Sequence, residues 1–554
     1  MYSWNLEKER LEAEAYLIGP RNDFVTTYMT VANLQFIIKE HPDIISKNSA
    51  DALFSVLSGT EHASQKQVFF LYKKAADGLG EMIQATRDRT LAETAKNALI
   101  HILTEFSGKP CRAAAEALGS VPLAVKGPRL PEKPASGIPG ISWGQLMKTS
   151  GFPARPSLQW KGRNVLVSSS DTSRILVLKM ARTGENPGML ADEGLWMDFL
   201  KDHLSGCFDD SGCPAPSRRF QIPCPIRISG SHVFQIDDFP FASRTSSQAA
   251  SGETSAIDPR ACAVGFTAPL DYFCYPNEHV NGRPLPEAAF LDIMGRNAWL
   301  LGRLTSFGIV HTAPIPLFHN RVQQERREDR GLYEWPRAGR LDRWLSSCRF
   351  PNIGKTGIRD FEHFISFSGS SRKLYQHIGS HVLSLVLVAG SYFRNLEAGL
   401  VGFDDGGNPV DARHLFDKRL FAETVHNIFL NYYNGFTGTT FCGPLPVNLD
   451  AFVCRLINEM GVDRHMEEIL RVAEQSAMTD AAFSDFLQSR GFSEGQIREF
   501  EKGKADIPIL TGPHLGGFNQ PISVPELIEF TGAASALCVA DRYFQEKFAN
   551  KTVN

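Results

Sequence analysis

Five residues spread along the sequence carry the side-chain groups that handle phosphate and a metal ion. They are Lys179, Glu193, His311, Asn320 and Asp360. A lysine ammonium attracts phosphate oxygens, and a carboxylate that faces an asparagine amide offers the oxygen ligands that Mg²⁺ prefers. Lys179 lies in the apolar run Arg174-Ile-Leu-Val-Leu-Lys-Met180, and Glu193 follows fourteen residues later. If the fold brings these residues together, they can bind a phosphate compound with its metal ion.

Each of these residues also has a simpler explanation. A lysine in an apolar strand commonly extends its ammonium to the surface, and an isolated aspartate is commonly a turn residue. The order along the chain favours the functional interpretation, because the five residues fall on a strand, a helix, a loop, a loop and a strand. For Lys179 and Asp360 we expect alanine substitutions to leave the fold intact, since a ligand-binding residue need not be part of the core.

The elements that must position these residues begin with a β-rich segment. Residues 163–169 and 174–180 are short runs rich in β-branched side chains, and Ser-Asp-Thr-Ser between them is typical of a hairpin turn. A helix is predicted over 189–203, and two further strands are predicted over 220–228 and 232–236. The segment 241–263 is rich in Ser, Ala and Thr and is predicted to be a loop.

The remaining regular elements are predicted to be helices. Apolar residues recur at three- and four-residue spacing through the first ~125 residues, over 288–307, and over about 372–398 and 412–434. The last hundred residues are also predicted to be helical, with an exposed charged segment at 494–504. Arg112-Ala-Ala-Ala-Glu-Ala-Leu-Gly119 resembles the second helix of a HEAT-like repeat. No second copy at a fixed period is visible, so a solenoid and a simple helical domain both stay open.

A β-rich segment followed by a helical one, with these motifs, resembles the divergent protein-kinase-like fold family, which includes atypical kinases, pseudokinases and the siderophore synthetases. Residues 174–179 resemble the third-strand motif V-A-I-K, and Glu193 lies where kinases place the glutamate that pairs with the lysine. Residues 300–311 resemble the helix and strand before a kinase catalytic loop. Arg359-Asp-Phe-Glu362 resembles Asp-Phe-Gly with a preceding arginine, as in the siderophore synthetases.

The resemblance covers about residues 150–440, and together with the residue patterns around it predicts an α+β fold in five parts. A helical domain, either HEAT-like or a simple helical domain, is expected over 1–125 and a Pro-rich linker over 126–156. A two-lobed kinase-like domain follows, with a β-rich small lobe over 157–285 and a helical large lobe over 286–445. A helical C-terminal extension is expected over 446–554.

The resemblance also implies ATP and Mg²⁺ as cofactors and a role for each residue. Lys179 binds phosphate and Glu193 orients it, His311 anchors the catalytic loop, and Asn320 and Asp360 hold the metal. The sequence departs from the kinase pattern at Ala313, which stands where a kinase has its catalytic aspartate, and the interval from Asn320 to Asp360 is much longer than the corresponding kinase hairpin.

Without that aspartate, two reactions stay open. His319 is the candidate base for ordinary phosphoryl transfer, since a histidine exchanges protons near neutral pH. Alternatively, a carboxylate attacks the α-phosphate and needs no base. We therefore favour an AMP-forming transferase or ligase over γ-phosphoryl transfer. The expected partners are a nucleotide, a protein or carboxylate-bearing small-molecule acceptor, and a protein partner on the N-terminal helices. A catalytically inactive pseudokinase and a helical-repeat scaffold are the alternatives.

Composition sets limits on these functions. The chain has 554 residues, with 58 Lys and Arg against 61 Asp and Glu, so its net charge of −3 provides no overall basic field for nucleic acid. The ten cysteines include no CxxC pair, which favours a reducing compartment over a zinc site. The start of the chain lacks the pattern of a signal peptide, and the most apolar stretch, 378–393, is too short to cross a membrane. We expect a soluble cytoplasmic protein.

Overall fold

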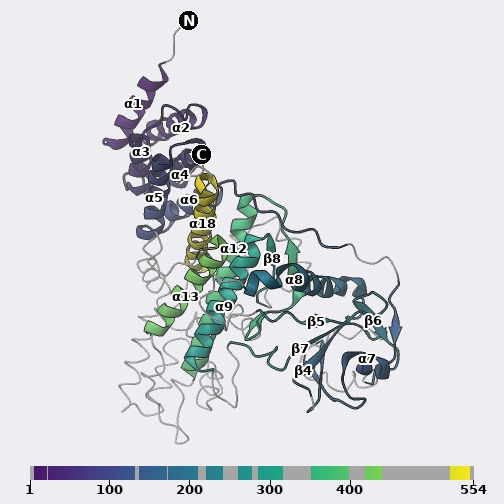
Figure 1. Cartoon of the computed structure of the whole chain (residues 1–554). Helices are drawn as coiled ribbons and strands as arrows, with labels where there is room; N and C mark the ends of the chain where they lie inside the picture. The colour runs from purple at the N-terminus through teal and green to yellow at the C-terminus, as the bar shows by residue number, and fades with distance from the viewer. Residues whose placement is uncertain are drawn as a thin grey trace, which may run out of the picture.

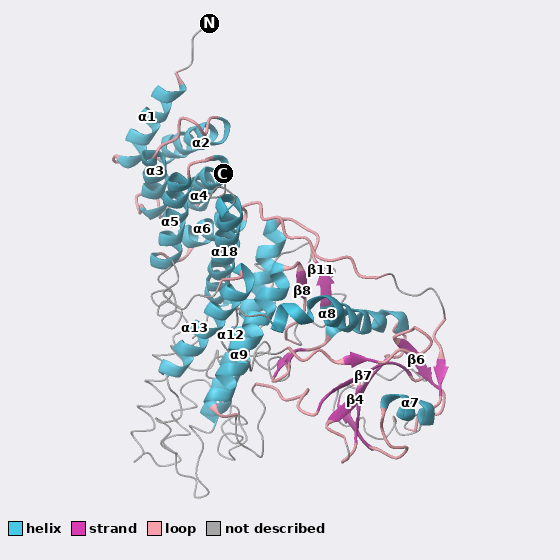
Figure 2. Cartoon of the chain, viewed as in Figure 1, coloured by secondary structure: helices cyan, strands magenta, loops and turns pink. Residues whose placement is uncertain are grey.

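The computed structural model describes eleven segments of the chain: 5–21, 23–131, 137–161, 163–170, 172–209, 220–240, 260–276, 285–315, 351–398, 418–439 and 524–549. Helices from both ends of the sequence form a tall column, and the part that contains most of the strands lies beside its lower half (Figure 1). Colouring by secondary structure separates the two regions clearly (Figure 2).

The N-terminal region consists of helices that pack against one another. They are α1 (Leu6–Ile18), α2 (Phe24–Glu40), α3 (Lys47–Ser58), α4 (Val68–Ala85), α5 (Arg89–Glu105) and α6 (Lys109–Gly119). Side chains that favour helix starts begin several of them: Asn5 accepts from the backbone N–H of Lys8, Asp23 from that of Thr26, and Asp88 from those of Thr90 and Leu91. The expectation of successive helices in this region is confirmed.

The main sheet is mixed, with seven strands. They are β1 (Gly140–Ile141), β2 (Ser157–Lys161), β3 (Asn164–Ser168), β4 (Arg174–Met180), β5 (Cys224–Pro225), β6 (Val233–Ile236) and β7 (Cys262–Pro269). Their order is β1-β6-β7-β4-β3-β2, β5 pairs with β7, and β1 runs parallel to β6 while the other pairs are antiparallel. Strand β4 is therefore central, and its Lys179 lies between Asn164 on β3 and Val264 on β7.

Two helices accompany the sheet. Helix α7 (Trp143–Ser150) follows β1, and α8 (Ala191–Asp209) follows β4 after the short 3₁₀ helix η1 (Pro187–Leu190). Gly194 allows α8 to approach the sheet closely, because a Cβ there would overlap the ring of His232, which precedes β6. Asp198 on α8 also pairs with His232. These contacts fix the position of α8, which carries Glu193.

In the described residues, the second region consists of long helices: α9 (Glu287–Ser306), α12 (Ser371–Ala398), α13 (Lys418–Thr437) and α18 (Val524–Ala549). Between α9 and α12 lie two small antiparallel pairs, β9 (Ile353–Gly354) with β10 (Gly357–Ile358), and β8 (Ile309–His311) with β11 (Phe364–Ser366). The 3₁₀ turn η4 (Phe361–His363) joins β10 to β11. These short strands bring His311 and Asp360 beside the main sheet.

Helices α9 and α13 approach each other through glycine. A Cβ at Gly302 would overlap the carbonyl oxygen of Tyr432, and one at Gly435 would overlap that of Trp299. Helix α18 packs against α12 and α13 and also against α5 and α6 of the N-terminal region. The first and last described helices of the sequence therefore share one core.

The helices predicted over 288–307, 372–398 and 412–434 correspond to α9, α12 and α13, and the strands over 163–169 and 174–180 to β3 and β4. Strands β2 and β7 were not predicted, and the first two residues of β7, Cys262 and Ala263, belong to the segment 241–263 that was predicted to be a loop. The strand expected over 220–228 is reduced to β5. In the segment interpreted as a linker, the structure has β1 and α7 instead. Of the last hundred residues, the structure describes only α18; the charged segment 494–504 lies outside the described residues.

The described helices include none that is long and apolar enough to span a membrane.

Candidate functional site

Lys179 and Glu193 form a buried ion pair. Lys179 is 4% exposed near the end of central strand β4, Glu193 is 1% exposed in the first turn of α8, and the lysine Nζ lies 2.7 Å from Glu193 Oε2. The expectation that Lys179 is not a core group is therefore wrong. Its stem is enclosed by the sheet, and its ammonium is compensated only by the carboxylates around it.

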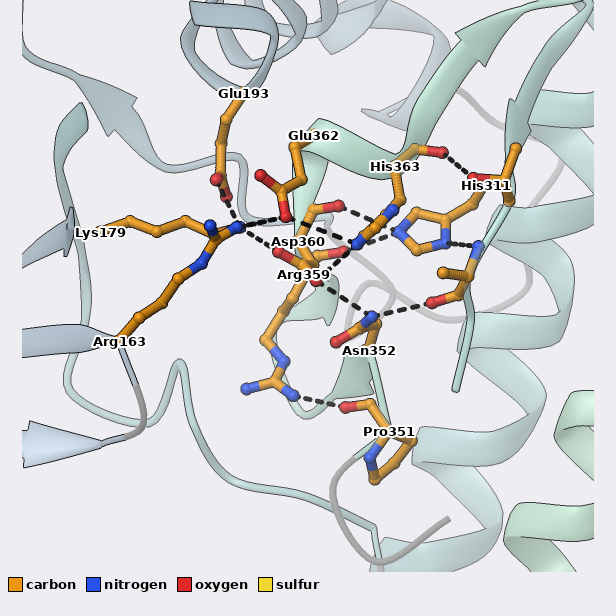
Figure 3. A network of polar contacts seen from close by, with 12 residues as sticks. Arg163, Lys179, Glu193, His311, Pro351, Asn352, Arg359, Asp360, Glu362 and His363 are labelled. Atoms are coloured by element: carbon orange, nitrogen blue, oxygen red, sulfur yellow. Dashed lines mark hydrogen bonds and ion pairs between the residues drawn. The ribbon is translucent and has the colours of Figure 1, made fainter. Parts of the chain in front are cut away.

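Asp360 lies two residues after the end of β10 and faces the same ammonium. Its Oδ1 pairs with Lys179 Nζ, and Glu362 Oε1 lies 3.3 Å from that nitrogen (Figure 3). The Asp360 backbone is left-handed, with φ 60° and ψ 60°, a conformation that costs energy for a residue with a Cβ. This turn directs the carboxylate of Asp360 away from the strand and into the cluster.

Arg163 adds a second cation from the turn between β2 and β3. Its Nη1 lies 3.3 Å from both carboxylate oxygens of Glu185, and its Nη2 pairs with Glu362. Between them, Lys179 and Arg163 contact four carboxylates, those of Glu185, Glu193, Asp360 and Glu362. With all of them ionised the cluster carries two excess negative charges, which suits a divalent cation.

Asn352, the residue before β9, reaches Asp360. Its Nδ2 donates to the carbonyl oxygen of Ala313 at 2.8 Å and to Asp360 Oδ2 at 3.3 Å (Figure 3). It is 6% exposed. From the sequence, Asn320 was the asparagine predicted to face the carboxylate at this strand end. In the structure, the amide beside the carboxylate of Asp360 is that of Asn352.

The donor set fits a metal ion. One ligand atom from each of Asp360, Glu362 and His363 lies within 4.8 Å of the others, and His363 Nε2 is 3.2 Å from Asp360 Oδ2. Carboxylate and amide oxygens suit Mg²⁺, whereas a ring nitrogen also accepts Mn²⁺ and similar metals. Asp360, Glu362, His363 and Asn352 are therefore the residues that would hold the ion.

His311 has a structural position beside this cluster. Its Nδ1 accepts from the backbone N–H of Ala313, so its Nε2 carries the proton and donates to the carbonyl oxygens of Arg359 at 2.9 Å and Asp360 at 3.2 Å. Burial, and then the neighbouring His363, lower the pKa of His311 to about 3. A neutral histidine with both nitrogens engaged holds the Asp360 turn in place; it does not exchange protons with a substrate.

Electrostatics favour the charged forms of Lys179 and Glu362, whereas burial opposes ionisation of Glu193. Burial alone would lower the pKa of Lys179, but Asp360, Glu193 and Glu362 outweigh it and raise the pKa above its usual value. Burial likewise opposes ionisation of Glu362, yet Lys179 dominates and lowers the pKa of Glu362 to about 2. For Glu193, burial prevails and raises the pKa. The lysine is a permanent cation here and cannot act as a base.

Of the residues predicted from sequence, the structure brings together Lys179, Glu193, Asp360 and His311. His319 and Asn320 lie outside the described residues. The contributions of Asn352, Arg163, Glu362 and His363 were not predicted. Asn352 lies eight residues before Asp360, but that spacing alone does not mark it as a ligand.

No model of a known protein family matches the chain. Its sequence is similar to that of the calmodulin-dependent glutamylase SidJ of Legionella pneumophila, with 22% identity over 290 residues. The similarity covers 49% of this chain and 30% of SidJ, so the chain spans less than a third of that relative.

Proposed function

We propose that the chain is an ATP- and Mg²⁺-dependent ligase with a two-lobed, kinase-like domain, and that it joins an amino acid of the glutamate class to a carboxyl group of an acceptor protein. The main support is the cluster in which Lys179, Glu193, Asp360 and Asn352 meet between the sheet and the helical region. A strand lysine paired with a helix glutamate, facing a carboxylate and an amide, is the arrangement that kinase-like enzymes use for ATP and its metal.

The reaction is proposed to form AMP. At the position of the kinase base the chain has Ala313, which is fully buried and whose N–H donates to His311. An acceptor carboxylate is already ionised and needs no base. Its oxygen attacks the α-phosphorus, the bond to pyrophosphate breaks, and an acyl-adenylate results. The amine of the amino acid then attacks the acyl carbon, AMP leaves, and the ammonium proton passes to water.

Each described residue has a part in this proposal. The metal, when bound, neutralises phosphate charge, and Asp360 and Asn352 would hold it. Lys179 and Arg163 orient phosphate oxygens, Glu193 fixes the direction of Lys179, and His311 holds the Asp360 turn. Positioning and charge neutralisation supply most of the acceleration in such a reaction.

The description of SidJ as a glutamylase agrees with this chemistry, since joining glutamate to a protein carboxyl requires activation of that carboxyl. Because SidJ is also described as calmodulin-dependent, the proposal for this chain includes a requirement for a helper protein of that kind. The N-terminal helices, which carry exposed apolar side chains such as Val25, Met29 and Phe70, are the surface that we assign to a protein partner.

A test uses the full chain with Mg²⁺, L-glutamate and ATP labelled either at the α- or at the γ-phosphate, with and without Ca²⁺-calmodulin, and with cell extract as acceptor. Release of labelled pyrophosphate from γ-labelled ATP, release of labelled AMP from α-labelled ATP, and a glutamyl mass increase on an acceptor are expected. All should be absent with Asp360→Asn. Transfer of γ-label to protein without AMP formation would refute the proposal.

A nucleotide-binding protein without turnover is the second candidate, and Ala313 is the observation that favours it. In that case the same assay yields no pyrophosphate under any condition, although Mg·ATP still raises the melting temperature.

A further inference from the structure

Arg359, the residue before Asp360, is a buried cation without a counter-charge. It is 4% exposed, its Nη2 donates to the carbonyl oxygen of Pro351, and its Nε has no hydrogen-bond acceptor. Among the residues that the structure describes, no carboxylate forms an ion pair with it. Lys179 and Arg163, by contrast, each contact at least two carboxylates. The side chain of Arg359 turns away from the Asp360 carboxylate, towards Pro351 (Figure 3).

The guanidinium of Arg359 lies against an aromatic segment that follows β7. Its Cζ is 4.1 Å from the ring centre of Tyr275 and 5.4 Å from that of Phe273. Tyr275 is 5% exposed. Cation–π contacts offset only part of the cost of removing a charge from water, and an arginine cannot lose its charge to escape that cost. The charge of Arg359 is therefore only partly compensated until an anion binds beside it.

A second cation approaches the same ring from the sheet. Lys161, the last residue of β2, has its Nζ 4.7 Å from the ring centre of Tyr275 and 5.0 Å from that of Phe273. It likewise makes no ion pair with a carboxylate in the described part of the chain. The two charged groups are no more than about 9 Å apart, since both lie on one ring. That separation suits two carboxylates on a short aliphatic chain.

From these observations we propose that Arg359 and Lys161 bind the two carboxylates of a dicarboxylic amino acid. This rests on the proposed function, in which such an amino acid reacts through its amine and keeps both carboxylates free. The planar fork of Arg359 matches one carboxylate with two parallel hydrogen bonds, from Nε and an Nη. The rings of Tyr275 and Phe273 suit contact with an aliphatic chain better than contact with a hydrated phosphate chain. Phosphate is assigned to two other cations, Lys179 and Arg163.

The test measures binding of three amino acids to the full chain in the presence of Mg²⁺ and a non-hydrolysable ATP analogue. L-Glutamate is compared with L-isoglutamine, in which the α-carboxylate is an amide, and with L-glutamine, in which the side-chain carboxylate is an amide. Wild type should bind glutamate at least tenfold more tightly than either amide. Arg359→Gln should bind one of the two amides as tightly as it binds glutamate, and Lys161→Gln should do so for the other amide. Both variants should bind the ATP analogue with an affinity within twofold of wild type.

Two further variants separate binding from folding. Arg359→Lys keeps the charge without the fork, so it should weaken glutamate binding while retaining the far-ultraviolet spectrum of wild type. Arg182→Gln removes an exposed arginine elsewhere and should change nothing. Equal binding of glutamate and both amides to wild type would overturn the proposal, as would a loss of ATP-analogue affinity in Arg359→Gln with glutamate binding retained.

The result of this binding test does not depend on whether the chain turns over ATP. If wild type forms AMP and glutamylated product but does not discriminate among the three amino acids, this inference fails and the proposed function stands. If no AMP forms while discrimination is present and lost in Arg359→Gln, the inference stands and the proposed function fails.

Discussion

The ammonium of Lys179 lies directly against the carboxylate of Asp360, so the group that we assign to phosphate and the group that we assign to the metal neutralise each other. A metal bound to Asp360 would release the ammonium for phosphate, and phosphate bound to Lys179 would release the carboxylate for the metal. Each ligand should therefore strengthen the binding of the other, by the same factor in both directions.

We accordingly expect Mg²⁺ to increase ATP affinity at least tenfold in wild type. Asp360→Asn should abolish this coupling, while its metal-free ATP affinity equals or exceeds that of wild type because Lys179 is no longer held. Fluorescence titration with and without EDTA measures both quantities. Metal-free ATP affinity far below that of wild type in Asp360→Asn would contradict this account of the ion pair.

The burial of Lys179 predicts a large effect on stability. Lys179→Met leaves Glu193, Asp360 and Glu362 without their shared cation, and removing one partner of a buried ion pair costs about 3–5 kcal/mol in free energy of unfolding. Adding Glu193→Gln should recover part of the loss, since it removes one of the stranded charges. Urea unfolding followed by fluorescence gives the values. The exposed Lys148→Met is the control and should change stability by less than ~0.5 kcal/mol.

Asn352 should control metal binding specifically. Asn352→Ala removes an amide beside Asp360, and we expect the Mg²⁺ concentration for half-maximal ATP binding to rise about tenfold, equivalent to ~1.4 kcal/mol. Asn352→Asp adds a carboxylate and should lower that concentration instead. Titration with Mn²⁺ followed by electron paramagnetic resonance measures the same trend directly. Equal metal affinity in wild type and Asn352→Ala would exclude this residue from the site.

Acid should destabilise the helical region through His381. This residue is 1% exposed on α12, its Nε2 donates to the carbonyl oxygen of His311 at 2.8 Å, and burial lowers its pKa to about 3. Histidine in the unfolded chain has a pKa near 6.5, so below that pH the unfolded chain binds a proton at His381 that the folded chain does not bind. Stability therefore falls as the pH drops from 6.5 towards 3.

For one histidine the loss is ~1.4 kcal/mol per pH unit, or about 2 kcal/mol between pH 6.5 and 5. Unfolding free energies of wild type and His381→Gln at these two pH values provide the test. The substitution removes the hydrogen bonds of the His381 ring to Thr305, Tyr432 and His311 and lowers stability at both pH values. The informative quantity is therefore the slope, which should be shallower in the variant. The exposed His101→Gln should retain the wild-type slope.

The close approach of α9 and α13 gives a packing prediction. Gly435→Ala places a methyl group into the carbonyl oxygen of Trp299, and overpacking of this kind costs about 1–3 kcal/mol. Thermal unfolding should show the loss as a lower melting temperature. Gly144→Ala on α7 meets no atom within 4 Å and should be neutral or slightly stabilising. A melting temperature for Gly435→Ala equal to that of wild type would mean that the two helices separate at little cost.

The elements with strong periodic patterns were predictable from sequence. Helices α9 and α12 repeat apolar residues at helical spacing, and β3 and β4 are rich in Val, Leu and Ile. Strand β7 was not predictable in the same way. Its sequence, CAVGFTAP, contains Ala, Gly and Pro, which are poor strand formers, and because it lies between two other strands it lacks alternating polar residues.

The site was predictable in part for a related reason. Lys179, Glu193 and Asp360 belong to local motifs, so sequence alone could name them. Arg163 and Asn352 join the cluster through the β2–β3 turn and the β9–β10 hairpin, and only the tertiary arrangement shows that these turns face Asp360. Arg359 was visible beside Asp360, but its lack of a counter-charge is a property of the folded state.

Helix α18 has a consequence for the order in which the protein is built. Asp541 pairs with Lys96 on α5 at 2.9 Å and accepts a hydrogen bond from Tyr433 on α13 at 2.8 Å, and Lys547 donates to the carbonyl oxygens of Ile83, Gln84 and Thr86 at the end of α4. Because α4, α5 and α6 precede α18 in the sequence, they are synthesised before the helix that covers them. Until α18 has been made, the apolar faces that it later buries are open to solvent, which is when a newly made chain is prone to aggregate.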